Sequence, residues 1–245
     1  MHGQNPVTKP QYRDDGSLYV KEIFYTIQGE GPFAGQPAVF VRLAGCNLRC
    51  HFCDTDFSGG SLMTPQEILQ AVYTRAPTSR CDLVVISGGE PLAQQIGPVV
   101  EKLSYALYRV QIETAGTCWP EPDLILMHLI QTADLGSDNV TIVCSPKTPQ
   151  LNSTVVSNCW HYKYIIRADE QDPEDLLPAF STQRQGERAH LYRPADRNSI
   201  IYVQPCDEGI LNKERTARNT QACVEAALRK GYRLSLQQHK ILNLP

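Results

Sequence analysis

The chain alternates short apolar runs with stretches in which apolar positions recur every three or four residues. Short runs rich in β-branched residues predict buried strands, and the periodic stretches predict helices. The predicted strands are 18–28, 38–45, 82–87, 108–114, 139–145, 162–167 and 199–205. The early strands alternate with predicted helices, which favours a parallel sheet with helices outside it.

Residues typical of helix ends mark the predicted helices. Thr64 as the N-cap, Pro65 in the first turn and Glu67 closing a capping box predict one helix start. Further helices are predicted around 97–107, from the Asp-Pro-Glu-Asp run at 172–175, and over 212–230 before Gly231. Residues 1–17 are polar and predict a loosely ordered extension. The remaining residues 18–245 then form a single domain.

Small polar clusters follow the predicted strands: AGC, SGGE, ETAG, SPK and QPCD. In strand–helix barrels the functional groups lie where strands end and loops begin. We therefore expect these clusters to surround one site.

Composition limits the partners and the location of the protein. The 245 residues are 42% hydrophobic and 20% charged, with a net charge of −3, as is ordinary for a soluble globular protein. Without a long basic run, neither nucleic acid nor an anionic membrane is an expected partner. No apolar run reaches the ~18 residues of a membrane span, and the first residues lack the apolar core of an export signal. We therefore expect a cytoplasmic location.

Three cysteines, Cys46, Cys50 and Cys53, have the spacing C-x3-C-x2-C. Thiolates suit zinc and iron–sulfur clusters. A structural zinc site usually has four Cys or His ligands, and His51 is the nearest fourth candidate. A four-iron cluster on three cysteines leaves one iron open for a substrate or cofactor, and this interpretation is favoured. A zinc-stapled binding module and an iron–sulfur electron carrier, which usually has four cysteines, remain alternatives.

The other six cysteines are dispersed among apolar residues. Free cysteine is among the most buried residue types, so each is predicted to be a small buried residue. They are Cys81, Cys118, Cys144, Cys159, Cys206 and Cys223.

Two motifs together resemble those of a known superfamily. The cysteine spacing with Phe52 before its last cysteine resembles the signature of the radical S-adenosylmethionine enzymes, and Ser87-Gly88-Gly89-Glu90-Pro91 resembles their second signature. The runs IFYTIQGEGPFAGQPAVFVRLAGCNLRCHFCDT, ISGGEP, IETAGT, SPK, QP and LSLQQHKILN occur in the order found in 7-carboxy-7-deazaguanine synthases. This resemblance covers almost the whole chain, from about Val20 to Pro245.

The resemblance implies an α/β fold: a modified, incomplete TIM-type (β/α) barrel of the radical S-adenosylmethionine type, commonly dimeric. It implies conversion of 6-carboxy-5,6,7,8-tetrahydropterin to 7-carboxy-7-deazaguanine with loss of ammonia, in the pathway to queuosine and other 7-deazapurines. The implied cofactors are a 4Fe-4S cluster, S-adenosylmethionine and Mg²⁺, with a one-electron donor such as flavodoxin. A glycyl-radical-activase-like enzyme shares the cysteine spacing and remains an alternative.

The same resemblance implies roles for individual residues. Cys46, Cys50 and Cys53 would hold the cluster, and Thr55 would bind the magnesium ion. The residues that would line S-adenosylmethionine are Phe52, Asp54, Gly89, Ser145, Pro146, Lys147, Gln204, Pro205, Cys206 and Asp207. The residues that would line the pterin are Ile27, Gln28, Gly29, Glu30, Arg42, Ser87, His239 and Pro245.

Three of these residues also have simpler interpretations. Arg42 lies inside an apolar strand, so it needs either a structural ion pair or a substrate carboxylate. Glu30 lies in a glycine-flanked loop, where it would be a solvated loop tip or would bind the guanidine-like edge of the pterin. His239 would be either a surface histidine or a substrate ligand.

Overall fold

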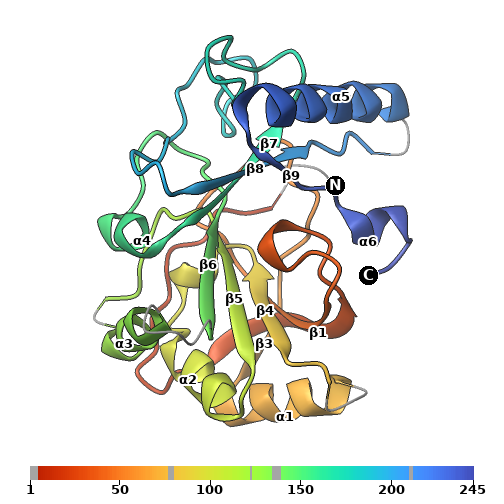
Figure 1. The fold of residues 1–245 in the computed structure, drawn as a ribbon. Helices are drawn as coiled ribbons and strands as arrows, with labels where there is room; N and C mark the ends of the chain where they lie inside the picture. The colour runs from red at the N-terminus through yellow and green to blue at the C-terminus, as the bar shows by residue number, and fades with distance from the viewer. Residues whose placement is uncertain (1–4, 77–79, 122, 134–138, 210–211) are drawn as a thin grey trace.

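The structure is a computed structural model, and it describes residues 5–76, 80–121, 123–133, 139–209 and 212–245. In this part of the chain, nine strands form one sheet with helices around it (Figure 1). The strands are β1 (Leu18–Ile27), β2 (Pro37–Leu43), β3 (Ser61–Met63), β4 (Leu83–Gly88), β5 (Arg109–Thr114), β6 (Val140–Cys144), β7 (His161–Ile166), β8 (Ile200–Pro205) and β9 (Arg233–Leu234). The helices are α1 (Pro65–Arg75), α2 (Gly97–Tyr105), α3 (Leu124–Ala133), α4 (Ser153–Asn158), α5 (Lys213–Lys230) and α6 (Gln238–Ile241), with short 3₁₀ turns at Gly31–Phe33 and Pro91–Ala93.

The strand order is β3-β1-β2-β4-β5-β6-β7-β8-β9. β1 pairs antiparallel with β2 and β3, whereas every pair from β2–β4 to β8–β9 is parallel. β3 and β9 stand at the two ends of the sheet, so the barrel is not closed. The predicted incomplete (β/α) barrel is confirmed.

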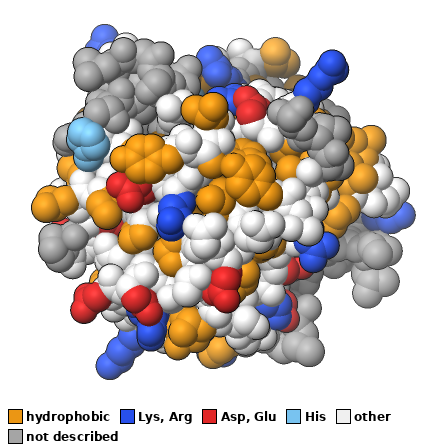
Figure 2. Space-filling model, turned by 90° about the horizontal axis from the view of Figure 1, so that it is seen from below, with side chains coloured by type: hydrophobic (Ala, Val, Ile, Leu, Met, Phe, Trp, Pro, Cys, Tyr) orange, Lys and Arg blue, Asp and Glu red, His pale blue; other side chains and the backbone are white. Residues whose placement is uncertain are grey.

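The central strands are buried on both faces. In β4, Leu83, Val84, Val85 and Ile86 are all fully buried, as expected for a parallel strand that is covered on both sides. α1, α2 and α3 pack in sequence along one side of the sheet, and α5 packs on β8. Seen from the side of α1 and α2, exposed hydrophobic side chains lie among charges of both signs (Figure 2).

The predicted helix ends are confirmed at α1 and α5. The Thr64 hydroxyl accepts from the Glu67 backbone N–H, and the Glu67 carboxylate accepts from the Thr64 backbone N–H at 2.8 Å. At the end of α5, Gly231 has a φ of 73°, a left-handed conformation that favours glycine.

The predicted helix at 172–175 is wrong, because these residues form turns. The carboxylates of Asp172 and Asp175 accept from the backbone N–H groups of Glu174 and Leu177. Such local side-chain bonds compete with helix formation. Leu176 follows with a φ of 61°, which a right-handed helix does not allow.

The sequence predicts loose order for residues 1–17, of which residues 1–4 lie outside the described ranges; residues 5–17 make hydrogen bonds to the domain. The Asn5 amide donates to the Thr55 carbonyl at 2.7 Å and accepts from the Phe57 N–H. The Thr8 backbone N–H and hydroxyl both donate to the Cys46 carbonyl. These polar side chains bind backbone groups beside the cysteine motif. Such contacts cannot be predicted from a hydropathy pattern, because the residues involved are polar.

This contact gives a test of the segment. Asn5 is buried, and its replacement would leave the buried Phe57 N–H without its partner and would remove one donor from the Thr55 carbonyl. We expect Asn5→Ala to lower the free energy of unfolding by about 1–3 kcal/mol, measured by urea denaturation. Asn198→Ala, at an exposed position, is the control and should change it by less than about 0.5 kcal/mol. Equal values for both variants would show that residues 5–17 add nothing to stability.

Five of the six remaining cysteines are buried, as predicted, while Cys118 is half-buried. Cys118 follows the loop after β5, where Thr117 hydrogen-bonds to Asn47 of the cysteine motif. The prediction of full burial is therefore wrong for Cys118.

Candidate active site at the strand ends

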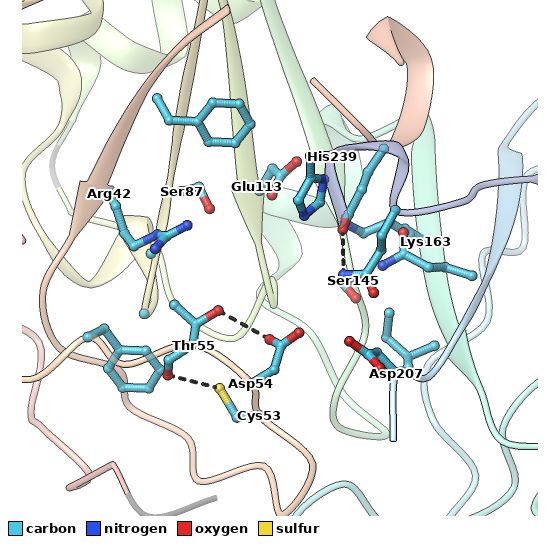
Figure 3. Close-up of a pocket in the computed structure, with 18 of the residues that line it drawn as sticks. Arg42, Cys53, Asp54, Thr55, Ser87, Glu113, Ser145, Lys163, Asp207 and His239 are labelled. Carbon is cyan, nitrogen blue, oxygen red and sulfur yellow. Dashed lines mark hydrogen bonds and ion pairs between the residues drawn. The ribbon is translucent and has the colours of Figure 1, made fainter. Parts of the chain in front are cut away.

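The carboxyl ends of the parallel strands surround one cavity of about 860 Å³ (Figure 3). In the view of Figure 3, Arg42 and Ser87 lie on one side, His239 and Lys163 on the other, and Cys53, Asp54 and Thr55 below. All the predicted site residues line this cavity except Gly29 and Pro146. Gly29 lies behind His239, and Pro146 lines a small neighbouring pocket with Phe52 and Lys147. The strand-end clusters therefore do surround one site.

Two glycines of the SGGEP motif pack directly on the backbone before Cys46. Gly88 has a φ of 125°, and a Cβ on it would lie 2.2 Å from the Leu43 carbonyl oxygen. A Cβ on Gly89 would lie 1.7 Å from the Gly45 carbonyl oxygen. Any larger residue would push the two motifs apart, so these glycines fix the SGGEP turn beside the cysteine loop.

Glu90 of the same motif is a buried structural residue. Its carboxylate accepts from the Thr114 hydroxyl at 2.5 Å and from the backbone N–H groups of Ala115 and Leu92. Burial raises the pKa of Glu90, although these hydrogen bonds oppose the shift. Glu90 thus ties the ETAG turn to the SGGEP turn at the rim of the cavity.

The three thiols of the cysteine motif face the cavity together. The Leu48 N–H donates to the Cys46 sulfur at 3.4 Å, and the Gln183 side-chain amide donates to the Cys50 sulfur at 3.2 Å. Burial raises the pKa of Cys46 to about 12. Cys46 is buried and Cys50 and Cys53 are half-buried. Thiols that share one cavity, two of them accepting N–H bonds, fit a metal cluster, which would deprotonate them. The donor set therefore fits an iron–sulfur cluster.

Lys147 of the SPK turn lies beside the cysteine motif. Its ammonium donates to the Ser145 hydroxyl at 2.7 Å and lies 5.6 Å from the centroid of the Phe52 ring. Burial lowers the pKa of Lys147. The SPK turn and the aromatic residue of the cysteine motif thus meet on one wall.

A buried ion pair lies further along this side of the cavity, on the neighbouring strand β7. Lys163, on β7, donates to Glu30, and the side chains are only 8% and 12% exposed. The Gln237 amide also donates to Glu30 at 2.9 Å. Burial raises the pKa of Glu30, but Lys163 and the hydrogen bonds outweigh it and lower the pKa to about 2. The interpretation of Glu30 as a solvated loop tip is therefore wrong.

Sequence reasoning missed Lys163, although a signal was present. Lys163 interrupts the apolar run YKYIIR in the same way that Arg42 interrupts AVFVRLAG. A charge inside a buried strand needs a partner, and the partner of Lys163 comes from a distant loop.

Glu113, at the end of β5, is a second acidic residue that was missed. Its carboxylate accepts from the side-chain amides of Gln28 at 3.0 Å and Gln111 at 2.8 Å. It lines the cavity and, with Glu30, gives this end of the site two carboxylates.

Arg42 forms the structural ion pair that its position suggests. It donates to Glu22 at 2.5 Å and lies 5.0 Å from the centroid of the Phe24 ring. Its side chain still lines the cavity, so a ligand carboxylate could reach it from the open side.

Residues near the end of the chain line the cavity, among them His239, Leu244 and Pro245. His239 is half-buried rather than a free surface residue, and a Cβ on Gly29 would lie 2.2 Å from its Nδ1. Burial lowers the pKa of His239, which favours the neutral ring. The Thr26 hydroxyl donates to the Pro245 oxygen at 3.0 Å. This segment thus completes the wall that contains Glu30 and Glu113.

Comparison with known proteins agrees with this geometry. Residues 41–136 match the model of the Radical SAM superfamily. The chain is 44% identical to a 7-carboxy-7-deazaguanine synthase of Rhodospirillum rubrum over 100% of both chains. The chain belongs to the 7-carboxy-7-deazaguanine synthase family. A synthase of Rickettsia prowazekii is 34% identical over 100% of this chain and 96% of that protein.

A solved structure of QueE from Escherichia coli shares the fold of this synthase-family chain. It has a TM-score of 0.61 at 21% sequence identity, and the match covers 90% of this chain and 93% of that one. Membership of the synthase family, within the radical S-adenosylmethionine superfamily, implies a 4Fe-4S cluster and S-adenosylmethionine as cofactors. It sets aside the zinc-stapled module, the electron carrier and the glycyl-radical-activase-like enzyme. None of the helices in the described ranges has the length and apolarity of a membrane crossing.

Proposed function

We propose that this protein converts 6-carboxy-5,6,7,8-tetrahydropterin to 7-carboxy-7-deazaguanine with loss of ammonia, as a step towards queuosine or another 7-deazapurine. The observation that carries the proposal is that one cavity contains both kinds of group the reaction needs. Three thiols line one end, and the other end has Glu30, Glu113 and His239. A site for a cluster thus adjoins a polar site large enough for a small heterocycle.

The cofactor end would consist of the cysteine motif and the loops that meet it. Cys46, Cys50 and Cys53 would hold the cluster. When bound, the cluster and S-adenosylmethionine supply a radical that removes a hydrogen atom from the substrate. The protein contributes binding, orientation and exclusion of water. The residues proposed for S-adenosylmethionine are Phe52, Asp54, Gly89, Ser145, Pro146, Lys147, Gln204, Pro205, Cys206 and Asp207.

The polar wall suits the amino-pyrimidinone edge of a pterin. That edge presents adjacent N–H donors, and a carboxylate accepts two such bonds side by side. Glu30 and Glu113 are the acceptors, and neutral His239 and Gln28 can position the ring. The remaining residues proposed for the substrate are Ile27, Gly29, Arg42, Ser87 and Pro245. Arg42 would bind the substrate carboxylate.

Magnesium would bind at Thr55, beside Asp54. The Thr55 hydroxyl donates to Asp54 at 3.2 Å and lines the cavity. One protein oxygen suffices for Mg²⁺ when substrate and water provide the other ligands. We expect turnover to rise when Mg²⁺ is added, Thr55→Ala to weaken that response by at least about tenfold, and the absorbance of the cluster to stay unchanged. Full turnover of chelator-treated enzyme would remove magnesium from the mechanism.

The other partners follow from the proposed chemistry. The cluster needs one electron from outside, which a flavodoxin-like carrier would donate, and an oxygen-sensitive cluster suits a reducing cytoplasm. We also propose a homodimer, which size-exclusion chromatography with light scattering would detect.

The proposed reaction is tested with anaerobically reconstituted protein, reductant, Mg²⁺, S-adenosylmethionine and the carboxypterin. We expect 7-carboxy-7-deazaguanine and ammonia to form in equal amounts. Cleavage of S-adenosylmethionine without either product would refute the substrate while leaving the superfamily chemistry intact.

A further inference from the structure

Lys240 joins two loops at the cofactor end of the cavity. Its ammonium lies 2.5 Å from Asp54 Oδ2 and 2.8 Å from Asp207 Oδ2. Asp54 directly follows Cys53, and Asp207 follows the QPC run after β8. Within the described ranges, no other lysine or arginine pairs with either carboxylate. Lys240 therefore provides the charge that allows the two carboxylates to approach each other.

The same short segment also contacts the wall that contains Glu30. The Gln237 amide donates to Glu30, and the Gln238 backbone N–H donates to the Gly29 carbonyl. Beyond Lys240, the Leu244 N–H donates to the His239 carbonyl. The next residue, Pro245, accepts from the Thr26 hydroxyl. Residues 237–245 thus lie across the cavity, between the wall of Glu30 and the pair of Asp54 and Asp207.

We propose that Lys240 is a positioning residue that couples substrate binding to cofactor binding. A ligand against Glu30 and His239 fixes segment 237–245, and Lys240 then fixes Asp54 and Asp207 at the other end. The ligand that binds at Asp54 and Asp207 then meets a site that is already ordered. Each of the two ligands therefore raises the affinity for the other. This inference rests on the proposed function, because it takes the two ligands to be the carboxypterin and S-adenosylmethionine.

The chemistry of lysine suits this role. An ammonium is a compact charge with three donors, so it can serve two carboxylates from different loops. Its flexible stem reaches from α6 without displacing His239 beside it. A methionine would keep the stem and lose the charge, which would leave two partly buried carboxylates facing each other.

The test is the affinity for S-adenosylmethionine, measured on anaerobically reconstituted protein by equilibrium dialysis with and without saturating carboxypterin. For the unaltered protein we expect the pterin to lower the Kd by about tenfold, within the usual range of coupling between sites. Lys240→Met should reduce this ratio to about one, and Lys240→Arg, which restores the charge, should recover part of it. Lys213→Met, at an exposed position on α5, should behave as the unaltered protein.

Linkage gives an internal check, because the cofactor must change the Kd of the pterin by the same factor. Circular dichroism and iron content show whether Lys240→Met is folded and loaded. If Lys240→Met is not folded or loaded, Asp207→Asn takes its place. This variant removes the Lys240–Asp207 ion pair and should also lower the factor by which the pterin changes the Kd of S-adenosylmethionine.

The coupling is refuted if Lys240→Met, or Asp207→Asn in its place, keeps the full ratio, or if the unaltered protein binds both ligands without cooperativity. Failure of the unaltered protein to bind the carboxypterin at all is a different result. It would refute the proposed substrate and, with it, the coupling to that substrate.

Discussion

Cys50→Ala is expected to lose the cluster and all turnover, whereas Cys118→Ala is expected to keep both. Cys50 lines the cavity with two other thiols and accepts a hydrogen bond from Gln183. Cys118 is the sharpest control: burial raises the pKa of its thiol, and the charges of Glu90 and Cys46 add to that shift. If Cys46, Cys50 and Cys53 are the three cluster ligands, the loss of Cys50 leaves only two, and the cluster is not retained.

The readouts are bound iron, sulfide and the production of 5′-deoxyadenosine after anaerobic reconstitution. The unaltered protein and Cys118→Ala should bind about four iron atoms per chain. Cys50→Ala should bind almost none and cleave no cofactor. A loaded cluster in Cys50→Ala together with an empty Cys118→Ala would mean that the ligands are wrongly assigned.

Lys163→Met is expected to have the largest effect on stability. Glu30 would remain buried with no opposite charge, and breaking a buried ion pair in this way costs about 3–5 kcal/mol. Lys230→Met, at the exposed end of α5, should change the free energy of unfolding by less than about 0.5 kcal/mol. The double variant Glu30→Gln/Lys163→Met should recover part of the loss, because the unpaired charge is gone. Urea denaturation of the four proteins gives these values.

The same pair predicts a dependence on pH. The folded pKa of Glu30, about 2, lies below its ordinary value of 4.5. The stabilisation is therefore complete above about pH 4.5 and is lost as the pH falls towards 2. The stability difference between the unaltered protein and Glu30→Gln should shrink over this interval. A constant difference, or a smaller loss in Lys163→Met than in Lys230→Met, would contradict the ion pair.

The strands and the position of the site follow from the sequence because both depend on local patterns. Short apolar runs such as Asp82–Ser87 become buried strands, and parallel strands bring their carboxyl ends to one edge. That geometry alone places Cys46, Gly89, Ser145 and Gln204 around one cavity. The spacing C-x3-C-x2-C indicates the chemistry, since few other functions need three thiols in that arrangement.

What the sequence does not predict depends on contacts between distant residues. Lys163 is paired with Glu30, 133 positions away, and Asn5 contacts the backbone 50 positions away. Neither pairing has a local signature. The false helix at 172–175 has the opposite cause: the Asp-Pro-Glu-Asp run resembles a helix start, but the carboxylates of Asp172 and Asp175 bind turn N–H groups instead.

The most direct test of the proposed function is product formation from 6-carboxy-5,6,7,8-tetrahydropterin by the reconstituted, reduced protein with Mg²⁺ and S-adenosylmethionine. We predict one 7-carboxy-7-deazaguanine and one ammonia per substrate consumed, identified by mass spectrometry, with Cys50→Ala inactive. Consumption of S-adenosylmethionine to 5′-deoxyadenosine with the pterin recovered unchanged would contradict the proposal.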